Sequence, residues 1–126
     1  MNLKELSRKV KYFFSISEGN YEQDQLGYFH WYEKDPKRLK WEAAMMNALF
    51  PQLILLRLRD GRLAYRGSVN GKDIALVFPY LYPIEPPQVA VFKEKVQGDD
   101  PDSFYTGFIW QTNMSAVDIL RGIQPN

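Results

Sequence analysis

The stretch QLILLRLRDGRLAYRGSVNGKDIALVF, residues 52–78, decides the fold of this chain. Apolar and polar residues alternate through it, and the dipeptides Asp60-Gly61 and Asn70-Gly71 divide it into three parts. Both dipeptides are typical of two-residue hairpin turns, because the central residues of such a turn need positive φ. The sequence therefore predicts three antiparallel strands in a meander, over residues 52–59, 62–69 and 72–78.

Two-residue turns would also fix how these strands pair. We expect Arg59 to face Arg62, Leu58 to face Leu63, and Val69 to face Lys72. The residues on one face of the predicted sheet are apolar: Leu56, Leu58, Leu63, Tyr65, Ile74, Leu76 and Phe78. Those on the other face are polar: Arg57, Arg59, Arg62, Arg66, Ser68 and Asp73. The alternation thus predicts a sheet with one face against a core.

A helix is predicted directly before the meander. Asp35 is suited to accept backbone N–H groups at a helix start, and Pro36 suits the first helical position. One side of the following turns is apolar, with Leu39, Ala43, Met46 and Phe50. Pro51 marks the end of this helix.

The chain after the meander begins with a proline-rich segment. Four prolines within residues 79–87 exclude a central strand or a helix interior. Residues 88–92 are expected to form a fourth strand, and the polar residues 93–102 a surface loop. Ser115 and Asp118 form a capping-box-like start of a C-terminal helix, whose apolar stripe is Ala116, Ile119, Leu120 and Ile123.

The N-terminal part is less uniform. Leu3, Leu6, Val10, Phe13 and Phe14 lie at helical spacing. Residues 15–34 are compatible with either an irregular loop or a short strand. The predicted fold is one α+β domain, residues 1–126: a four-stranded antiparallel meander with a helix before it, a C-terminal helix packed on one face, and an extra N-terminal helix.

Composition limits the classes of function. Sixteen Lys and Arg against fifteen Asp and Glu give a net charge of +1, which does not favour nucleic acid as the partner. No apolar stretch approaches the ~20 residues of a membrane span, and no signal-peptide core follows Met1. The chain contains no cysteine, which excludes disulfides, thiolate metal sites and thiol nucleophiles. We expect a cytoplasmic protein without cofactor or metal.

The proline-rich segment resembles that of ubiquitin-conjugating enzymes, in which Phe-Pro, Tyr-Pro and Pro-Pro steps precede a strand. The matching residues here are Phe78-Pro79, Tyr82-Pro83-Ile84-Glu85-Pro86-Pro87 and Val89-Ala90-Val91-Phe92. Weaker matches follow the family's order: Arg38-Leu39, Gly67, Trp110, Ser115, Ile119-Leu120 and Ile123-Gln124. The resemblance covers residues 35–124 and leaves residues 1–34 as an N-terminal extension. The noncatalytic RWD domains share this fold and a similar signature, and they remain an alternative.

The catalytic segment of that family has no counterpart. Its nucleophile is a cysteine preceded by a His-Pro-Asn element, and no cysteine, histidine or asparagine occurs between Phe92 and Trp110. One alignment places Trp110 at the nucleophile, and the other matches it to a later tryptophan and implies a deletion. Both alignments lose the thioester chemistry. The resemblance therefore implies a noncatalytic module that binds proteins.

The resemblance also implies where such a module binds. In the family, the proline loop contacts ligases, which nominates Pro79, Tyr80 and Ile84. The outer sheet face of the family can bind ubiquitin-like proteins, which nominates Arg57, Arg59, Arg62 and Arg66. Tyr82, Pro83, Pro86 and Pro87 are expected to form a rigid turn. The expected partner is a ubiquitin-like protein, a ligase or an activating enzyme.

Other residues whose side chains could bind a metal or take part in catalysis have structural interpretations. His30, the only histidine, lies among aromatic residues, and Asp99, Asp100 and Asp102 are expected to be loop charges. Trp31, Trp41 and Trp110 are expected in the core. Two alternative functions stay open. The first is an enzyme that uses a nonthiol nucleophile such as Ser103 or Thr106, or a cysteine from another chain, and the second is a structural subunit that docks through residues 28–32.

Overall fold

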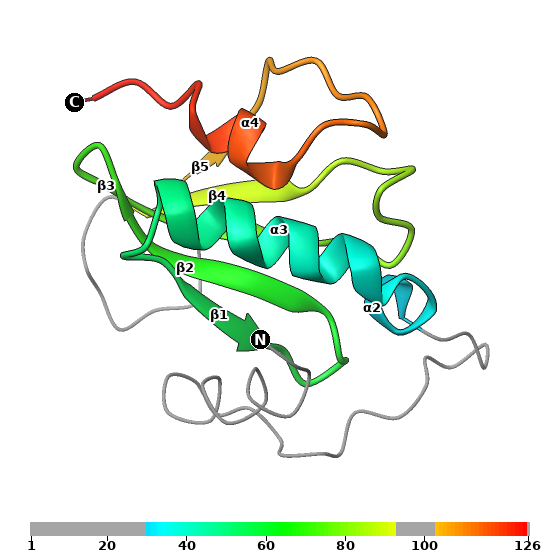
Figure 1. The fold of residues 1–126 in the computed structure, drawn as a ribbon. Coiled ribbons are helices and arrows are strands. Elements are labelled where there is room, and N and C mark those ends of the chain that lie inside the picture. Colours follow the sequence, from blue (N-terminus) through cyan, green and yellow to red (C-terminus); the bar gives the residue numbers. More distant parts are fainter. Residues whose placement is uncertain (1–29, 93–102, 126) are drawn as a thin grey trace.

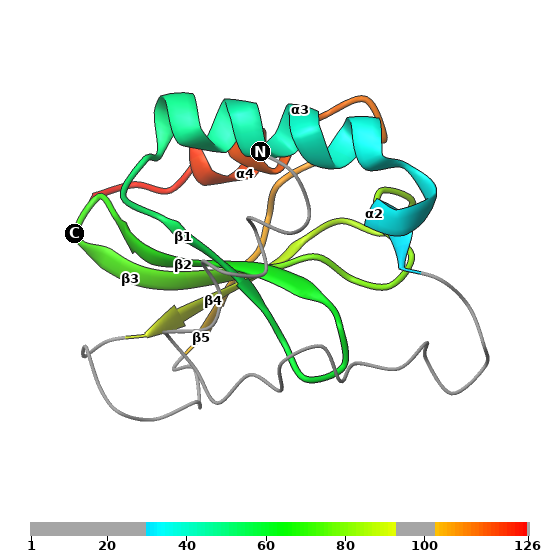
Figure 2. The same cartoon turned by 60° about the horizontal axis from the view of Figure 1, so that its bottom comes forward.

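The structure, a computed structural model, describes residues 30–92 and 103–125. It consists of two layers, an antiparallel sheet and helices α3 and α4 on one face of it (Figures 1 and 2). The elements are α2 (Trp31–Lys34), α3 (Pro36–Leu49), β1 (Ile54–Arg57), β2 (Leu63–Val69), β3 (Lys72–Val77), β4 (Gln88–Phe92), β5 (Ser103–Tyr105) and α4 (Ala116–Leu120). The strands lie in the order β1-β2-β3-β4-β5. The predicted α+β class is confirmed.

Among the described residues the sheet has five strands, so the prediction of four is wrong. The additional strand, β5, pairs with β4 through Val89 opposite Tyr105 and Val91 opposite Ser103. Its three residues are too few for a period-2 pattern, and it pairs only because the chain returns to the edge of β4.

The second hairpin has the predicted register. Val69 faces Lys72, and both turn residues, Asn70 and Gly71, have positive φ, at 50° and 83°. These are the left-handed conformations that a two-residue type I′ turn requires.

The register predicted for the first hairpin is wrong by one residue. The Leu58 N–H donates to the Arg62 carbonyl at 2.8 Å, so the loop has three residues, 59–61. Only Gly61 has positive φ, at 88°. The Asp60 carboxylate accepts bonds from the Arg62 backbone N–H (3.1 Å) and from its Nε (2.7 Å). A turn stabilised by aspartate and followed by a left-handed glycine is the usual three-residue hairpin loop.

This shift exchanges the faces of β1. Leu55 now faces Tyr65 on the core side, whereas Leu56 faces Ala64 on the other side of the sheet. Arg57 faces Leu63 on the core side, so it does not share a face with Arg66. The sequence predicted a purely polar outer face, and this prediction is wrong. It carries four buried apolar residues, Leu56, Ala64, Ala90 and Phe92.

Helix α3 begins where the sequence predicts. The Asp35 carboxylate accepts a bond from the Arg38 N–H at 3.1 Å, and Pro36 is the first helical residue. The start of α4 is also as predicted: the Ser115 hydroxyl accepts from the Val117 N–H (3.1 Å), and the Asp118 carboxylate accepts from the Ser115 N–H (2.9 Å). This helix ends at Leu120, before Ile123, the last member of the predicted apolar stripe.

The described end of the segment 15–34 forms neither a loop nor a strand. It forms the short helix α2, which the Glu33 carboxylate caps by accepting from the His30 N–H at 3.3 Å. Trp31 lies in the core, but Trp41 is 40% exposed, so its predicted core position is wrong. The predicted N-terminal helix and the predicted loop 93–102 lie outside the described residues.

The core lies between the sheet and the two longer helices. Its residues include Leu39 and Met46 from α3, Ile119 and Leu120 from α4, and Leu55, Leu63, Tyr65, Ile74, Leu76 and Val89 from the strands. Within the described ranges, none of the helices is long and apolar enough to cross a lipid bilayer.

Candidate protein-binding surface at the proline turn

Residues 79–87, the proline turn, connect β3 to β4 near α2 and the start of α3 (Figure 1). The Tyr82-Pro83 peptide is cis. The Tyr82 ring is buried and lies 4.7 Å from the Phe78 ring and 4.8 Å from the Trp31 ring, measured between centroids. Pro83 is half-buried and Pro87 buried, whereas Pro86 is exposed. An aromatic cluster thus fixes the turn from the core side.

A buried carboxylate on α3, that of Glu42, joins this helix to the proline turn and to the start of α4. Glu42 is only 1% exposed. The Tyr82 hydroxyl donates to its Oε1 at 2.6 Å, while the Ser115 hydroxyl (3.1 Å) and the Ala116 N–H (3.0 Å) donate to its Oε2. The three donors satisfy the carboxylate without water.

Burial dominates the titration of this cluster. Removal from water disfavours the charged form and raises the pKa of the Glu42 carboxyl, although the bonds from Tyr82, Ala116 and Ser115 and the Arg38 charge act in the opposite direction. Burial also raises the pKa of the Tyr82 hydroxyl, and the neighbouring Glu42 adds to that rise. The Tyr82 hydroxyl therefore keeps its proton at neutral pH and is the donor in its hydrogen bond to Glu42.

Arg38 fastens the segment before α4 to α3. Its Nη1 donates to the Thr112 carbonyl at 2.7 Å, and its Nη2 donates to the Met114 carbonyl at 2.6 Å and to the Tyr82 hydroxyl at 3.0 Å. The same Nη2 lies 3.6 Å from Glu42 Oε1. One guanidinium, with its donors in a fixed planar arrangement, thereby positions residues 112–114 against the proline turn.

Trp110 makes the second link between these segments. Its indole Nε1 donates to the Pro83 carbonyl at 2.8 Å, and its ring lies 5.6 Å from that of Tyr82. The Trp110 side chain is therefore held against Tyr82 and Pro83 of the proline turn.

This arrangement exposes three large apolar side chains, Leu81, Ile84 and Ile109, which we term the apolar turn surface. Their exposed fractions are 56%, 76% and 80%. Ile84 and Ile109 each adjoin one residue of the bonded Pro83–Trp110 pair. A contiguous exposed apolar patch marks a binding surface more often than scattered apolar residues do.

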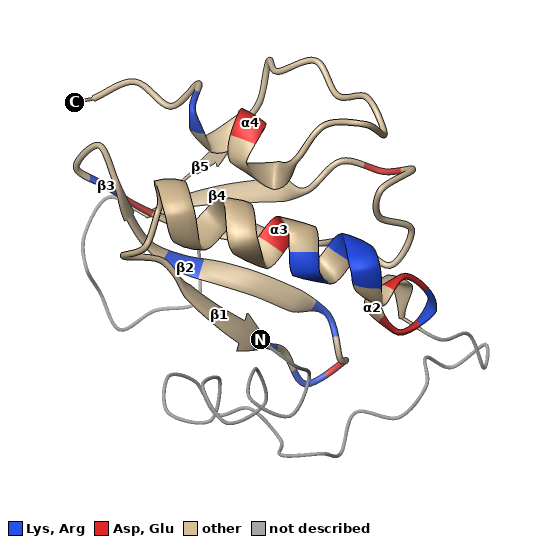
Figure 3. Ribbon diagram, viewed as in Figure 1, with Lys and Arg blue, Asp and Glu red and all other residues tan. Residues whose placement is uncertain are grey.

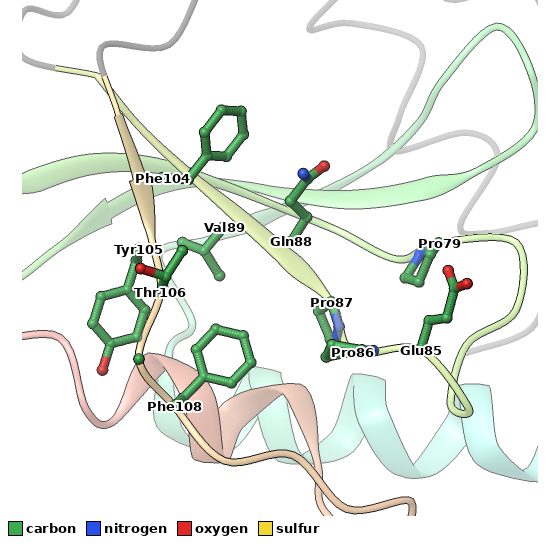
Figure 4. A pocket seen from close by; sticks show the side chains of 11 residues that line it. Pro79, Glu85, Pro86, Pro87, Gln88, Val89, Phe104, Tyr105, Thr106 and Phe108 are labelled. Atoms are coloured by element: carbon green, nitrogen blue, oxygen red, sulfur yellow. The ribbon is translucent and has the colours of Figure 1, made fainter.

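Tyr80, a predicted contact residue, is largely engaged within the molecule. Its ring stacks on the His30 ring at 5.4 Å, and its hydroxyl donates to the Asp60 carbonyl at 3.3 Å. The Arg62 guanidinium lies 5.8 Å from the centroid of the same ring. Pro79, also predicted, lines a groove of about 530 Å³ between the turn and the residues after β5 (Figure 4).

The structure does not gather the four predicted arginines on one face. Along the ribbon, the Lys and Arg positions are spread over several elements (Figure 3). Arg66 lies on the outer face, where it pairs with Asp73 at 2.9 Å and stacks 3.8 Å from the Phe92 ring centroid. Arg62 pairs with Asp60, Arg59 lies in the loop, and Arg57 points to the core side. Their role in binding a partner stays a prediction.

Residues considered for catalysis are dispersed. His30 is buried and its ring stacks between Tyr32 and Tyr80, each at 5.4 Å. Ser103 and Thr106 are exposed. The described ranges contain no group of three His, Cys, Asp or Glu side chains able to hold a metal ion, and Asp99, Asp100 and Asp102 lie outside those ranges.

Sequence reasoning missed Arg38 and Glu42 as interacting residues, and it missed Ile109 as an exposed one. A signal existed for Glu42, because it lies three residues after Leu39 and four before Met46, within the apolar stripe of α3. A charged residue in such a stripe indicates a buried, bonded group. Nothing local marks Ile109.

Comparison of the chain with protein-family models, with curated proteins and with solved structures found no match.

Proposed function

We propose that this chain is a noncatalytic protein-interaction module that contacts its partner through the apolar turn surface. The observation that carries this proposal is the exposure of Leu81, Ile84 and Ile109 on two segments that the partly buried bond between Trp110 and Pro83 joins. A preorganised apolar surface binds with a small loss of conformational entropy.

The anchoring below the surface supports a binding role. Trp110, Arg38 and Glu42 fix the two segments that carry the exposed side chains. Apolar anchors surrounded by fixed backbone are the usual centre of protein interfaces. A loop without such anchoring would have to be ordered on binding.

The proposed partner is a ubiquitin-like protein or an enzyme of its conjugation pathway, a ligase or an activating enzyme. The supporting features are the order of elements and the proline-turn residues, both of which resemble ubiquitin-conjugating enzymes. The chain itself carries no cysteine, so it offers no thiol for thioester transfer.

The experiment is an NMR titration of the ¹⁵N-labelled chain with a panel of ubiquitin-like proteins, activating enzymes and ligase domains. We expect one of them to shift the amide signals of residues 81–84 and 109–110. Ile84→Asp and Ile109→Asp should each weaken that complex at least about tenfold, the effect of about 1.4 kcal/mol that a desolvated apolar anchor exceeds.

Leu49→Asp is the matched control. Leu49 is 47% exposed at the end of α3, away from the proline turn, and its substitution should leave binding unchanged. Absence of binding across the panel contradicts the proposed partner class. Binding that Leu49→Asp weakens as much as Ile84→Asp contradicts the proposed surface.

A further inference from the structure

The outer face of the sheet, on the side away from α3 and α4, is largely apolar. The strand register places these apolar residues on it: Ile54, Leu56, Ala64, Val77, Ala90 and Phe92. The free face of a two-layer antiparallel sheet is usually in contact with water and carries polar side chains. The composition of this face therefore indicates a second contact surface of the sheet.

Two of these residues are already buried within the single chain. Leu56 on β1 faces Ala64 on β2, and their exposed fractions are 1% and 3%. None of the described helices provides the cover, because α3 and α4 lie on the other face and Trp31 and Tyr32 of α2 belong to the core cluster (Figures 1 and 2). The burial of Leu56 and Ala64 therefore points to a cover from residues outside the described ranges, and it requires no second copy of the chain.

Only one stretch outside the described ranges is rich in apolar side chains. Residues 93–102, KEKVQGDDPD, contain one Val and no Leu, Ile, Met or aromatic residue. Residues 1–29 are different, because part of them follows the apolar spacing of an amphipathic helix. The residues with this spacing are Leu3, Leu6, Val10, Phe13 and Phe14. The N-terminal stretch is therefore the part of the chain suited to cover an apolar face.

The place where the described chain begins brings this stretch within reach. The Tyr32 hydroxyl donates to the Gly61 carbonyl at 2.8 Å, so α2 lies beside the loop that joins β1 to β2. Residues 15–29 can span up to about 50 Å when extended. Residues 3–14 would form a helix about 18 Å long, and neighbouring strands of a sheet lie about 4.8 Å apart. Such a helix can reach the outer face and cover several strands.

We propose that residues 3–14 bind to the outer face of the sheet as an intramolecular ligand. Their apolar side, centred on Leu6, Val10 and Phe13, packs against Leu56 and Ala64. The segment thereby occupies the face on which Arg66 lies, and a protein that binds this face must displace it. The inference goes beyond the proposed function, because it concerns a different surface and an occupant from the chain itself.

The experiment measures by NMR how closely a soluble gadolinium chelate approaches the methyl groups of the full chain. Leu55 and Leu56 are adjacent residues on opposite faces of the sheet, so one serves as the internal reference for the other. We expect the methyl groups of both to be protected from the chelate in the natural chain. In Leu6→Asp/Phe13→Asp, the methyl groups of Leu56 should lose this protection and approach the relaxation rate of the exposed Ile84, while those of Leu55 stay protected.

A charge-matched variant is the control. Arg8→Gln/Ser15→Asp changes the net charge by the same amount as Leu6→Asp/Phe13→Asp, but it replaces no apolar side chain. It should leave the Leu56 methyl groups protected. Continued protection of Leu56 in Leu6→Asp/Phe13→Asp would assign the cover to another part of the chain and overturn the inference. An equal loss of protection in the control would overturn it as well.

A spin label tests the same contact without removing any apolar residue. The chain has no cysteine, so Ser7→Cys provides a single attachment point for a nitroxide. The label should broaden the methyl signals of Leu56 and Ala64 more than those of Ile119 and Leu120, which lie in the other layer. Equal or stronger broadening in α4 would overturn the inference, even where Leu6→Asp/Phe13→Asp fails to fold. Binding through the apolar turn surface should not change on labelling, so the two proposals are tested separately.

Discussion

Glu42 shows how one charged residue organises this molecule. Its carboxylate is buried in the middle of α3, yet it is surrounded by donors from the proline turn and from the start of α4. A buried carboxylate without donors is very unfavourable, so the fold depends on these bonds being made together. The residue is in effect the point at which three segments are joined.

We expect Glu42→Ala to lower the free energy of unfolding by about 3–5 kcal/mol, because it leaves Arg38, Ser115 and the Ala116 N–H without their shared acceptor. Urea denaturation followed by circular dichroism measures this. Glu85→Ala, at an exposed site, should change it by less than about 0.5 kcal/mol. A loss below about 1 kcal/mol for Glu42→Ala would contradict the role assigned to the carboxylate.

The pH dependence of stability follows from the same burial. Because the pKa of Glu42 is raised in the folded chain, the folded state holds a proton that the unfolded state loses first. The contribution of Glu42 is therefore greatest below its ordinary pKa of 4.5 and declines as the pH rises through the raised value. The difference in unfolding free energy between the natural chain and Glu42→Gln should fall as the pH is raised from 4.5, the ordinary pKa, towards neutrality. A difference in unfolding free energy that rises over this pH range would contradict the raised pKa of Glu42.

At the scale of elements, the sequence predicts hairpins better than it predicts their register. Alternation and the two glycine turns predict strands β1, β2 and β3, and the capping residues predict where α3 and α4 begin. Asn70-Gly71 leads to the expected register, but Asp60-Gly61 does not. An Asp-Gly step fits both a two-residue and a three-residue loop, and the choice depends on the bond between Asp60 and Arg62. That contact has no local sequence signal.

The Asn70 turn separates a backbone effect from a side-chain effect. Asn70 has φ of 50°, and its Nδ2 donates to the Ile123 carbonyl at 2.7 Å. Asn70→Gly keeps the left-handed backbone and loses the bond, so it should cost about 1 kcal/mol. Asn70→Ala loses the same bond and also places an alanine in the left-handed region, so it should lower the free energy of unfolding by about 1–2 kcal/mol more. Equal losses of thermal stability in the two variants would show that the backbone conformation contributes nothing.

At the scale of the whole molecule, the two-layer α+β arrangement could be predicted, but its edges could not. Local patterns contain no information on β5, whose pairing depends on where the chain returns after residues 93–102. The exposed position of Ile109 likewise depends on the bond between Trp110 and Pro83, which joins residues 27 positions apart. Of the apolar turn surface, only Ile84 was predicted from the sequence; Leu81, also in the proline turn, and Ile109, in the later segment, were not.

Removal of residues 112–126 tests whether the sheet and α3 can fold cooperatively without α4. It deletes five apolar residues that are almost wholly buried, Ala116, Val117, Ile119, Leu120 and Ile123, together with two of the three donors to Glu42. We expect the shortened chain to lose its cooperative urea transition, because burial of each such side chain contributes about 1–3 kcal/mol and a domain has only about 5–15 kcal/mol of stability. A retained sharp transition would show that α3 and the sheet fold without α4.

The bonds between α3 and the start of α4 also set the order of events during protein synthesis. Ser115 leaves the ribosome 73 residues after Glu42. Until then the Glu42 carboxylate lacks two of its three hydrogen-bond donors, Ser115 and Ala116, and packing it against the meander would bury an incompletely bonded group. We therefore expect the nascent helix to stay off the sheet, leaving the apolar side of the meander open to chaperones while translation continues.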